Sequence, residues 1–563
     1  MIRRNLAIAL CINLFFLALC LIFGDLKYGA IDDYFMAAVL TGAHGTDYNP
    51  HLLFVNALYG YALIPLYKLF PTIGWYYIGE MSSIFLCLTT ISYTIIKKMG
   101  LQWGSIIAAL FVAMFASDFY LVVQFTQCAS LLSATGMLVF AIAVCEGRRL
   151  PFAYALFLLL WGSVMRWQAF LMGMPFFCIG LLFLIKKCWA NKIPVITTLA
   201  LMFGISYGLH HWDRNLYNTP EYKPYMEIQG PRAALGDGSN YNQNAVYEDL
   251  DEMGKSGKDY HMLTSWTFYD TEAFAKDSMQ AIVNIIGNYT RKNHHNEIPA
   301  QLLKSLGHSL QTPLFWTWFI ACLIILGTNR KQFPYLWASI AAIFYLMTVL
   351  LAQNRLVYRV EGGFWLYASM LAIPLWNQIS QEKLNRIINK KNVTLILFLI
   401  AFANIYAYAT EGNTVRDPSN GRSRTLTIED STDYKQVFDY IDSNQDKMFL
   451  LSMNAYMRFS HHKMPPYKAE PIGSYHNTIS LGYWTPYLPE ITKTLANYGI
   501  TNPMRQVTDS NVIVINDDKL GDFLMRHYYG ENNLENATSD TIIVDTLRSI
   551  GEMNFFKYRL VHK

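Results

Sequence analysis

Two adjacent carboxylates, Asp32 and Asp33, stand just after the first apolar run of the chain, in GDLKYGAIDDYFMAAVL (residues 24–40). One acid at such a place can accept backbone N–H groups at the start of a helix. The pair can also do chemistry, with one carboxylate taking a proton from an acceptor hydroxyl while the other orients that hydroxyl or holds a cation. The local sequence favours neither interpretation, so the elements around the pair have to decide.

Five further charged residues lie at the ends of apolar runs: Glu80, Asp118, Arg166, Arg355 and Arg359. A charge at membrane depth costs several kcal/mol unless it is paired or wetted, so each one marks a candidate functional position. The guanidinium group is a planar, permanently charged fork that matches phosphate oxygens. The three arginines therefore predict a phosphorylated lipid held at the membrane surface. For each arginine alone, the alternative is that it reaches toward a lipid headgroup.

The composition points to a membrane protein with sizeable water-facing parts. Of the 563 residues, 53% are hydrophobic and only 15% are charged, which is too apolar for an ordinary soluble protein. The net charge of +4 is small and no long basic run is present, so nucleic acid is not expected as a partner. The eight cysteines lie in or beside apolar runs, and they do not suggest a disulfide framework.

The membrane spans can be predicted from the apolar runs, because a helix needs about 20 apolar residues to cross a bilayer and fewer inside a bundle. Eleven stretches qualify: 6–24, 75–96, 104–118, 126–145, 152–166, 167–185, 193–210, 313–327, 333–352, 363–379 and 393–409. Lys and Arg recur at every second turn, at 3–4, 97–98, 148–149, 186–187, 330–331 and 383–391. Since cytoplasmic loops carry an excess of these residues, the N-terminus is predicted to be cytoplasmic and the C-terminus to lie outside.

This alternation holds only if the apolar stretch 52–70 does not cross the membrane. We interpret it as a helix in the outer interface or packed on the bundle, with Leu52, Leu58, Ile64 and Leu66 on its apolar face. The alternative is a twelfth span, which would invert every later loop. The exported regions are then a first loop (25–74), a long loop (211–312) and a C-terminal segment (410–563).

The C-terminal segment is predicted to be an α/β domain. Helical spacing relates Tyr434, Val437, Phe438 and Ile441, while residues 447–453, 511–516 and 541–547 have the composition of strands. Alternating helices and strands suggest one small mixed sheet. The predicted fold is thus a polytopic α-helical membrane protein of about eleven transmembrane helices (residues 1–410) with a C-terminal extracytoplasmic α/β domain (residues 411–563).

Residues 1 to about 410 resemble the GT-C superfamily of integral-membrane glycosyltransferases. The features that carry the resemblance are one span followed by the acidic pair in IDDY, interfacial helices in the first loop, short central spans with an outward arginine, and an exported C-terminal domain. The chain is more similar to bacterial members, and it has no WWDYG-like motif, which argues against transfer to asparagine. The resemblance implies an inverting enzyme of the bacterial inner membrane. It would move a sugar from a polyprenyl-phosphate donor to a cell-envelope glycan, lipid or protein.

Carried onto this chain, the superfamily pattern makes Asp33 or Asp32 the general base, with a slight preference for Asp33, and Asp118 a second acid. Arg166, Arg355 and Arg359 become the candidates for binding the donor phosphate, where negative charge develops. A divalent cation, Mg²⁺ or Mn²⁺, is a further possibility, held by Asp32 and Asp33 with His51, and with His44 and Asp47 as additional candidates. The irregular spacing of His44, Asp47 and His51 favours ordinary loop polarity as the explanation over a cation site.

Acceptor binding is predicted at aromatic and charged residues of the exported regions. Arg232, Trp266 and Asp270 lie in the long loop and Trp484 in the C-terminal segment, and Glu80 opens the second span. Aromatic rings pack on the C–H faces of sugars while polar groups take the hydroxyls. Aromatic residues folded against a helical bundle are the alternative.

Two other functions fit parts of the pattern. A polysaccharide polymerase or ligase also combines many spans with a large exported loop and arginines, but its first loop need not begin with acids. A lipid-linked sugar transporter would show internal repeats and broken helices at the bilayer midplane. In this chain the charges cluster instead at one face of the predicted membrane region.

Overall fold

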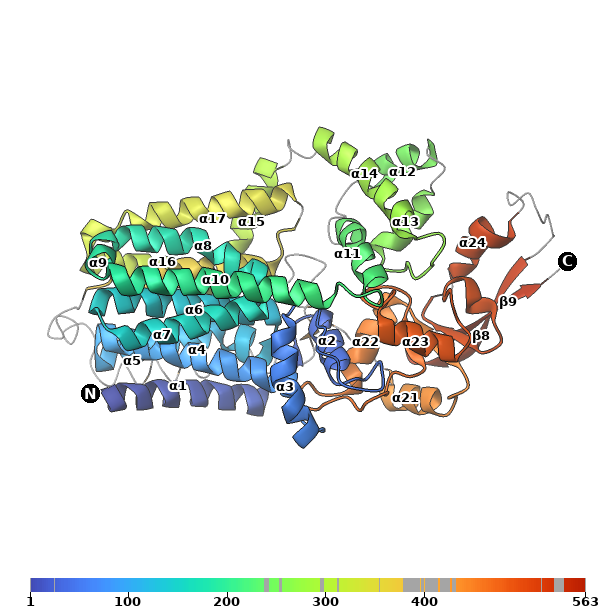
Figure 1. Cartoon of the computed structure of the whole chain (residues 1–563), viewed down its shortest axis with the longest axis horizontal. Helices are drawn as coiled ribbons and strands as arrows, with labels where there is room; N and C mark the ends of the chain where they lie inside the picture. The colour runs from blue at the N-terminus through green and yellow to red at the C-terminus, as the bar shows by residue number, and fades with distance from the viewer. Residues whose placement is uncertain are drawn as a thin grey trace.

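The computed structural model consists of a helical bundle and a second folded region beyond one end of it (Figure 1). It describes residues 2–24, 26–236, 243–252, 256–293, 298–310, 313–353, 355–377, 432–517, 519–530 and 541–561, and six isolated residues at 395, 399, 414, 415, 426 and 427. The N-terminus lies at the far end of the bundle, and the C-terminal sheet lies beyond the opposite end. The molecule is therefore elongated, with its apolar helices separated from its sheet.

In the part of the chain that the structure describes, the bundle contains ten helices and a short connecting helix. They are α1 (Ile2–Phe23), α4 (Trp75–Met99), α5 (Leu101–Ala116), α6 (Phe125–Glu146), α7 (Arg149–Met165), α8 (Trp167–Phe183), α9 (Ile185–Ala190), α10 (Lys192–Leu216), α16 (Pro313–Thr328), α17 (Tyr335–Ala352) and α18 (Tyr358–Ala372). Short η segments adjoin them at Ser117–Leu121 (η1), Arg330–Gln332 (η2) and Ile373–Leu375 (η3). Helix α15 (Ile298–Ser309) precedes α16.

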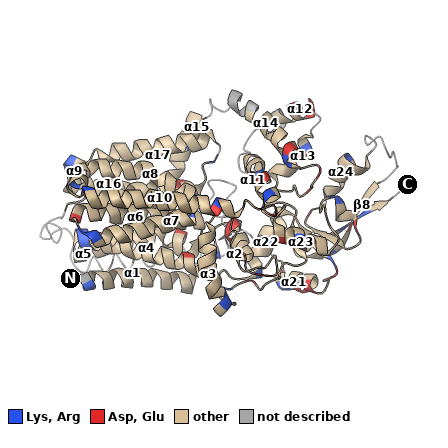
Figure 2. Ribbon diagram, viewed as in Figure 1, with Lys and Arg blue, Asp and Glu red and all other residues tan. Residues whose placement is uncertain are grey.

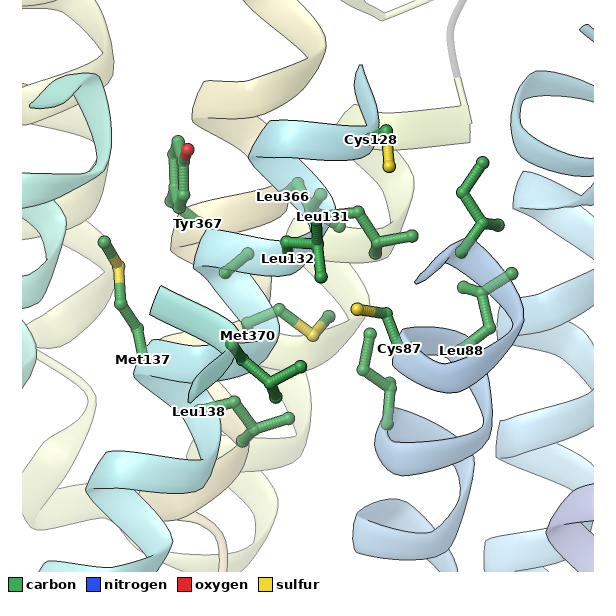
Figure 3. Packing of buried hydrophobic residues seen from close by; sticks show 14 of the residues in the cluster. Cys87, Leu88, Cys128, Leu131, Leu132, Met137, Leu138, Leu366, Tyr367 and Met370 are labelled. Atoms are coloured by element: carbon green, nitrogen blue, oxygen red, sulfur yellow. The ribbon is translucent and has the colours of Figure 1, made fainter. Parts of the chain in front are cut away.

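Helix α6 forms the centre of the bundle, where nearly all of its side chains are buried. Figure 3 shows Leu131 and Leu132 of α6 between Cys87 of α4 and Leu366 of α18. Apolar side chains gain little by leaving lipid, so close fit has to hold membrane helices together. Glycines permit that fit between α6 and α7, since a Cβ at Gly136 would lie 2.7 Å from the Leu159 side chain.

The predicted spans agree with the helices of the structure at ten of the eleven stretches. Five described helices are long and apolar enough to cross a bilayer alone: α1, α4, α6, α10 and α17 with the preceding turn. Helices α5, α7 and α8 are apolar but shorter. The protein is therefore a multi-pass membrane protein. The span predicted at 393–409 lies almost entirely outside the described residues, so the count of eleven stays a prediction.

The described turns among those predicted to be cytoplasmic, at 3–4, 97–98, 148–149, 186–187 and 330–331, lie together at one end of the bundle (Figure 1). Lys97 forms an ion pair with Glu146, and Lys98 donates to the carbonyls of Pro374 and Trp376 at 3.1 and 3.3 Å. Figure 2 shows Lys and Arg gathered at this end, whereas the middle of the bundle has few charged residues. This is the charge distribution of a membrane-spanning region. The side of the membrane that this end faces stays a prediction.

The stretch 52–70 contains a helix too short to cross a membrane. Helix α3 (Ala57–Leu69) has 13 residues, which gives a length of about 20 Å against a hydrocarbon core of about 30 Å. It lies across the end of the bundle nearest the second folded region (Figure 1). Its length fits the predicted interfacial helix rather than a twelfth span, and its place relative to the membrane stays a prediction.

A five-stranded sheet lies in the C-terminal part of the chain. Its order is β6 (Thr478–Ser480), β5 (Met448–Leu451), β7 (Val512–Ile515), β9 (Met553–Val561) and β8 (Thr541–Ile550). The strands β6, β5 and β7 are parallel, and β9 pairs antiparallel with both β7 and β8. Strands are thus present at all three predicted stretches, and the sheet is mixed as expected. The short strands β3 (Thr414–Val415) and β4 (Leu426–Thr427) pair with each other.

The second folded region, called the head below, has one apolar core built from residues 31–54, 217–286 and 434–558. Its helices are α2 (Ile31–Leu40), α11 (Lys223–Gly236), α12 (Gln243–Glu252), α13 (Gly257–Thr264), α14 (Lys276–Asn293), α21 (Tyr434–Asp442), α22 (Met453–Lys463), α23 (Pro489–Asn497) and α24 (Leu520–Leu524), with η4 (Arg505–Thr508) and η5 (Met525–Tyr529). All three predicted exported regions therefore contribute to one core. The domain boundary predicted near 410 lies outside the described residues.

Candidate active site between the bundle and the head

A small parallel ladder positions the two acids of the first loop. Strand β1 (Lys27–Tyr28) pairs with β2 (Val122–Val123), and the Gly29 N–H donates to the Val123 carbonyl at 2.6 Å. This ladder ties the start of the first loop to the connection between α5 and α6. Helix α2 then begins at Ile31, with Ala30 as an N-cap that makes no side-chain hydrogen bond. Neither acid is the N-cap, so helix capping does not account for the pair.

Asp32 points toward the head and toward α18. Its Oδ1 accepts hydrogen bonds from the Trp484 indole at 2.8 Å and from the Tyr483 hydroxyl. Its Oδ2 lies 3.9 Å from Nη2 of Arg359. Asp32 is 7% exposed. The Asp32 carboxylate is thus almost buried, accepts two hydrogen bonds through one oxygen and has a guanidinium group near the other.

Asp33 points in another direction, because successive residues on a helix diverge by roughly 100°. It is fully buried, and its Oδ1 accepts from the Tyr76 hydroxyl at 3.1 Å and the Phe125 backbone N–H at 3.2 Å. Its Oδ2 has no hydrogen-bond partner among the described residues. Burial raises the pKa of Asp33 well above its ordinary value, and the neighbouring charge of Asp32 raises it further, against the two hydrogen bonds. The two adjacent acids therefore have different surroundings, and the neutral form is favoured at Asp33.

An aromatic wall, formed by Phe54, Trp266, Tyr483 and Trp484, lies beside Asp32. The Trp484 ring is 4.5 Å from that of Phe54, and the Trp266 ring is 5.7 Å from Tyr483 and 5.9 Å from Trp484. The guanidinium group of Arg232 stacks on this wall, 3.5 Å from the Trp484 ring centroid and 5.2 Å from that of Trp266. Three of the predicted acceptor residues, Arg232, Trp266 and Trp484, are thus in contact.

Arg166 meets the same wall from the bundle. Its guanidinium group lies 4.8 Å from the Phe125 ring and 5.6 Å from the Phe54 ring, and it donates to the Thr126 hydroxyl at 3.0 Å. Phe54 stacks on Phe125 at 5.8 Å and contacts Trp484 on its other side. A continuous series of rings therefore leads from Arg166 to the neighbourhood of Asp32.

Backbone strain is concentrated at this wall. Five non-glycine residues in the described part of the chain have a left-handed φ, and Leu53 (63°), Trp266 (60°) and Tyr483 (62°) are three of them. Such a conformation costs roughly 1–2 kcal/mol for a residue with a side chain. Strain of this kind persists where the surrounding structure holds it, and it is common at functional sites.

Asp118 is connected to the site through α18. Its Oδ2 accepts from the Tyr358 hydroxyl at 2.9 Å, and Tyr358 directly precedes Arg359 at the start of that helix. A cavity with room for about one water molecule lies beside Asp118. Its lining residues are Asp118, Phe119, Gln127, Ser130, Leu314, Gly362, Gly363 and Leu366. Asp118 is therefore placed to anchor the helix that carries Arg359.

The other predicted residues have separate surroundings. Arg355 is exposed in the connection between α17 and α18. The carboxylate of Asp270 accepts from the Tyr528 hydroxyl at 2.8 Å and from two backbone N–H groups that follow it in the chain. Glu80 is fully buried in α4, and both of its carboxylate oxygens are without a hydrogen-bond partner in the described structure.

The residues considered as cation ligands do not converge. His51 hydrogen-bonds Asn49 at 2.7 Å and stacks on Tyr222 at 4.3 Å, while Asp47 accepts from the next backbone N–H. His44 is buried elsewhere in the head core. Within the described ranges, no three His, Cys, Asp or Glu side chains are grouped to hold a metal ion. The divalent cation stays a prediction.

Two residues of the site were not singled out from the sequence. Tyr483, which donates to Asp32, was not among the predicted site residues, although the adjacent aromatic pair in LGYWTPY was a usable signal. Phe54 gave no signal, because a phenylalanine in an apolar stretch is typical of a packed core. Gly482 precedes the pair, and a Cβ there would overlap the Trp266 carbonyl oxygen. The glycine therefore permits the close approach of two segments far apart in the chain.

No known protein family matches the chain, and no curated protein matches it. Two solved structures of ArnT from Cupriavidus metallidurans are similar to it, each at 10% identity over 98% of this chain and 97% of the other. The TM-score is 0.41 for the apo state and 0.39 for the structure bound to undecaprenyl phosphate. At TM-scores below 0.5, this likeness does not decide fold or function.

Proposed function

We propose that the protein is a membrane glycosyltransferase that moves a sugar from a polyprenyl-phosphate donor to an acceptor hydroxyl. The observation that carries the proposal is the place of Asp32. Its carboxylate is nearly buried between an apolar helical bundle and a folded head, with Arg359 at 3.9 Å and an aromatic wall beside it. A reaction between a lipid-borne group and a water-soluble group needs its base at such a boundary.

In the proposed reaction Asp32 is the general base. The acceptor hydroxyl gives its proton to the Asp32 carboxylate while its oxygen bonds to the anomeric carbon. The bond from that carbon to the lipid phosphate breaks on the opposite face, so the configuration inverts and the electron pair leaves with the phosphate. The pKa of Asp33 is raised, first by its burial and then by the charge of Asp32, which favours the protonated form and makes Asp33 the poorer base. This argument reverses the slight preference for Asp33 drawn from the sequence.

The proposed leaving group is a phosphate, and its charge needs fixed cationic partners. Arg359 is the first candidate because it lies beside Asp32 at the start of α18. Arg166 is the second, since its guanidinium group sits at the bundle end of the aromatic series and is half-buried. Arg355, exposed just before α18, is a third candidate at the rim.

The acceptor is proposed to lie on the head side, against the aromatic wall. Trp266, which is only partly buried, offers a ring face that suits the C–H faces of a sugar, and the buried Trp484 lies beside it. Arg232, stacked on both rings, adds a cation that suits an anionic or hydroxyl-rich group. We propose a cell-envelope glycan, lipid or protein as the acceptor, at the outer face of the bacterial inner membrane with the N-terminus in the cytoplasm.

The test is transfer by the purified protein in proteoliposomes supplied with a panel of radiolabelled polyprenyl-phosphate sugars and a cell-envelope extract. We expect label to leave at least one lipid donor and to enter an acceptor, and the isosteric variant Asp32→Asn to abolish this transfer. Label that changes leaflet without leaving its lipid would indicate a transporter. Products that grow by repeated addition would indicate a polymerase.

A further inference from the structure

We propose that Tyr483 and Trp484 of the head are positioning residues for the Asp32 carboxylate. This inference rests on the proposed function, because it concerns the group assigned as the base. Both residues lie in the C-terminal segment, about 450 positions from Asp32, and both donate to the same oxygen, Oδ1. The proposed general base, which comes from the first loop, would then be oriented by the C-terminal segment.

The hydrogen bonds leave one carboxylate oxygen for the reaction. A carboxylate oxygen has two lone-pair directions, and those of Asp32 Oδ1 are taken by an O–H and an N–H donor. The remaining oxygen, Oδ2, is the one that lies toward Arg359. An acceptor hydroxyl therefore has to approach Oδ2, beside the cation assigned to the leaving phosphate.

The turn that carries the two donors is held rigidly by the sheet. The Leu481 N–H donates to the Leu451 carbonyl of β5 at 2.9 Å, and the Leu481 carbonyl accepts from Phe268 and Tyr269 N–H groups at 3.0 and 2.8 Å. The Thr485 hydroxyl donates to the Ser480 carbonyl at 2.7 Å. Residues 481–486 are buried. A turn pinned to the sheet on one side and the long loop on the other is suited to position a side chain rather than to move as a lid.

The backbone conformation of Tyr483 supports the same role. Its φ of 62° is left-handed, as is the φ of 60° at Trp266 across the wall. Gly482 allows these two strained segments to touch, since any side chain there would collide with the Trp266 carbonyl. The strain is thus maintained by contacts between the long loop and the C-terminal segment, and the result is a hydroxyl aimed at Asp32.

The test compares Tyr483→Phe with a matched control, Tyr558→Phe, in transfer assays over pH 4 to 9. Both changes delete one hydroxyl of a buried tyrosine, but the Tyr558 hydroxyl donates to the Asp517 carbonyl, away from Asp32. A lost hydrogen bond to a charged group should lower kcat about tenfold and move the acidic limb of the pH–rate profile upward by about one unit. The KM for the donor should stay within about twofold of the parent value. The control should keep the parent profile.

Each alternative outcome is distinguishable. If Tyr483→Phe loses activity with an unmoved acidic limb, its role is structural and the inference is overturned. If kcat rises, the tyrosine blocks the carboxylate instead of orienting it. Trp484→Phe supplies a second variant should Tyr483→Phe fold poorly, with folding followed by the Tm in detergent. If the parent protein transfers no sugar from any lipid donor, the proposed function itself fails, and the inference fails with it.

Discussion

Replacing each acid of the adjacent pair by its isosteric amide separates the two carboxylates. If Asp32 is the base, Asp32→Asn removes the proton acceptor and leaves the geometry of the site in place. Asp33→Asn keeps a carbonyl oxygen for the Tyr76 hydroxyl and the Phe125 N–H, which are the partners of its Oδ1. It replaces only the oxygen that has no partner in the described structure. The two substitutions are therefore equally small changes of the chain, but only Asp32→Asn removes the proposed proton acceptor.

The expected magnitudes differ by at least tenfold. General-base catalysis contributes about 10²–10⁴-fold, so Asp32→Asn should lower kcat by at least about a hundredfold. Burial and the charge of Asp32 raise the pKa of Asp33 and so favour its neutral form. Converting a neutral acid to a neutral amide should keep kcat within about tenfold of the parent.

The free energies of unfolding of the parent and of Asp33→Asn should also depend differently on pH. The pKa of Asp33 in the folded protein lies well above the value of an unfolded aspartate, about 3.9. Below that value both states are protonated. As pH rises above it, the unfolded state loses its proton first, so the free energy of unfolding falls by about 1.4 kcal/mol per pH unit until the folded pKa is reached. Asp33→Asn lacks this loss, so its Tm should rise relative to that of the parent as the pH increases above about 4.

The assay is transfer of radiolabelled sugar in proteoliposomes, with the Tm of each variant measured in detergent at pH 5 and pH 7. Comparable Tm values would exclude misfolding as the cause of lost activity. The reasoning is refuted if Asp33→Asn is as inactive as Asp32→Asn, or if Asp32→Asn retains more than a tenth of the parent kcat. A Tm of Asp33→Asn that falls relative to the parent as pH rises would refute the burial argument.

Three further changes have defined outcomes. Burial lowers the pKa of His44 to about 3. The free energy of unfolding of the parent therefore decreases as the pH falls below about 6.5, because the unfolded state takes up a proton first. The Tm of His44→Phe should fall less on acidification than that of the parent. Gly482→Ala places a methyl group against the Trp266 backbone and should lower the free energy of unfolding by about 1–3 kcal/mol. The control Gly230→Ala has open space around its Cα and should not lower it. Denaturation in detergent measures both. Arg359→Met should lower kcat about a hundredfold, and Arg359→Lys should lower it less, with an unchanged Tm in both. If both variants are as active as the parent, Arg359 does not act on the leaving phosphate.

The sequence alone was sufficient for the elements that depend on local patterns. Apolar length and the recurrence of Lys and Arg predicted ten stretches that are helical in the structure, because a bundle helix needs a long apolar run. The strands at 447–453, 511–516 and 541–547 were readable from their β-branched and apolar composition. The short strand β6 and the pairing of β9 were not, since tertiary contacts define them.

The residue types of the site could also be read from the sequence, but not which of these residues come into contact. Two acids in a first loop and tryptophans in exported segments indicate carbohydrate chemistry by type. Only the folded chain brings Trp266 and Trp484 together on Arg232, because the three come from a long loop and a C-terminal segment that share one core. Asp270 had the same local appearance as these residues, yet its carboxylate is taken up by Tyr528.

The sequence by itself determined that this is a multi-pass membrane protein with an acidic pair at the start of its first loop. The tertiary structure decided which surroundings each acid has. Asp32 and Asp33 are adjacent and chemically identical, so no pattern distinguishes them. One turns to the donors of the head and to Arg359, while the other turns into the bundle core, where burial favours its neutral form. Their difference arises from desolvation and from partners hundreds of residues away, and neither is encoded locally.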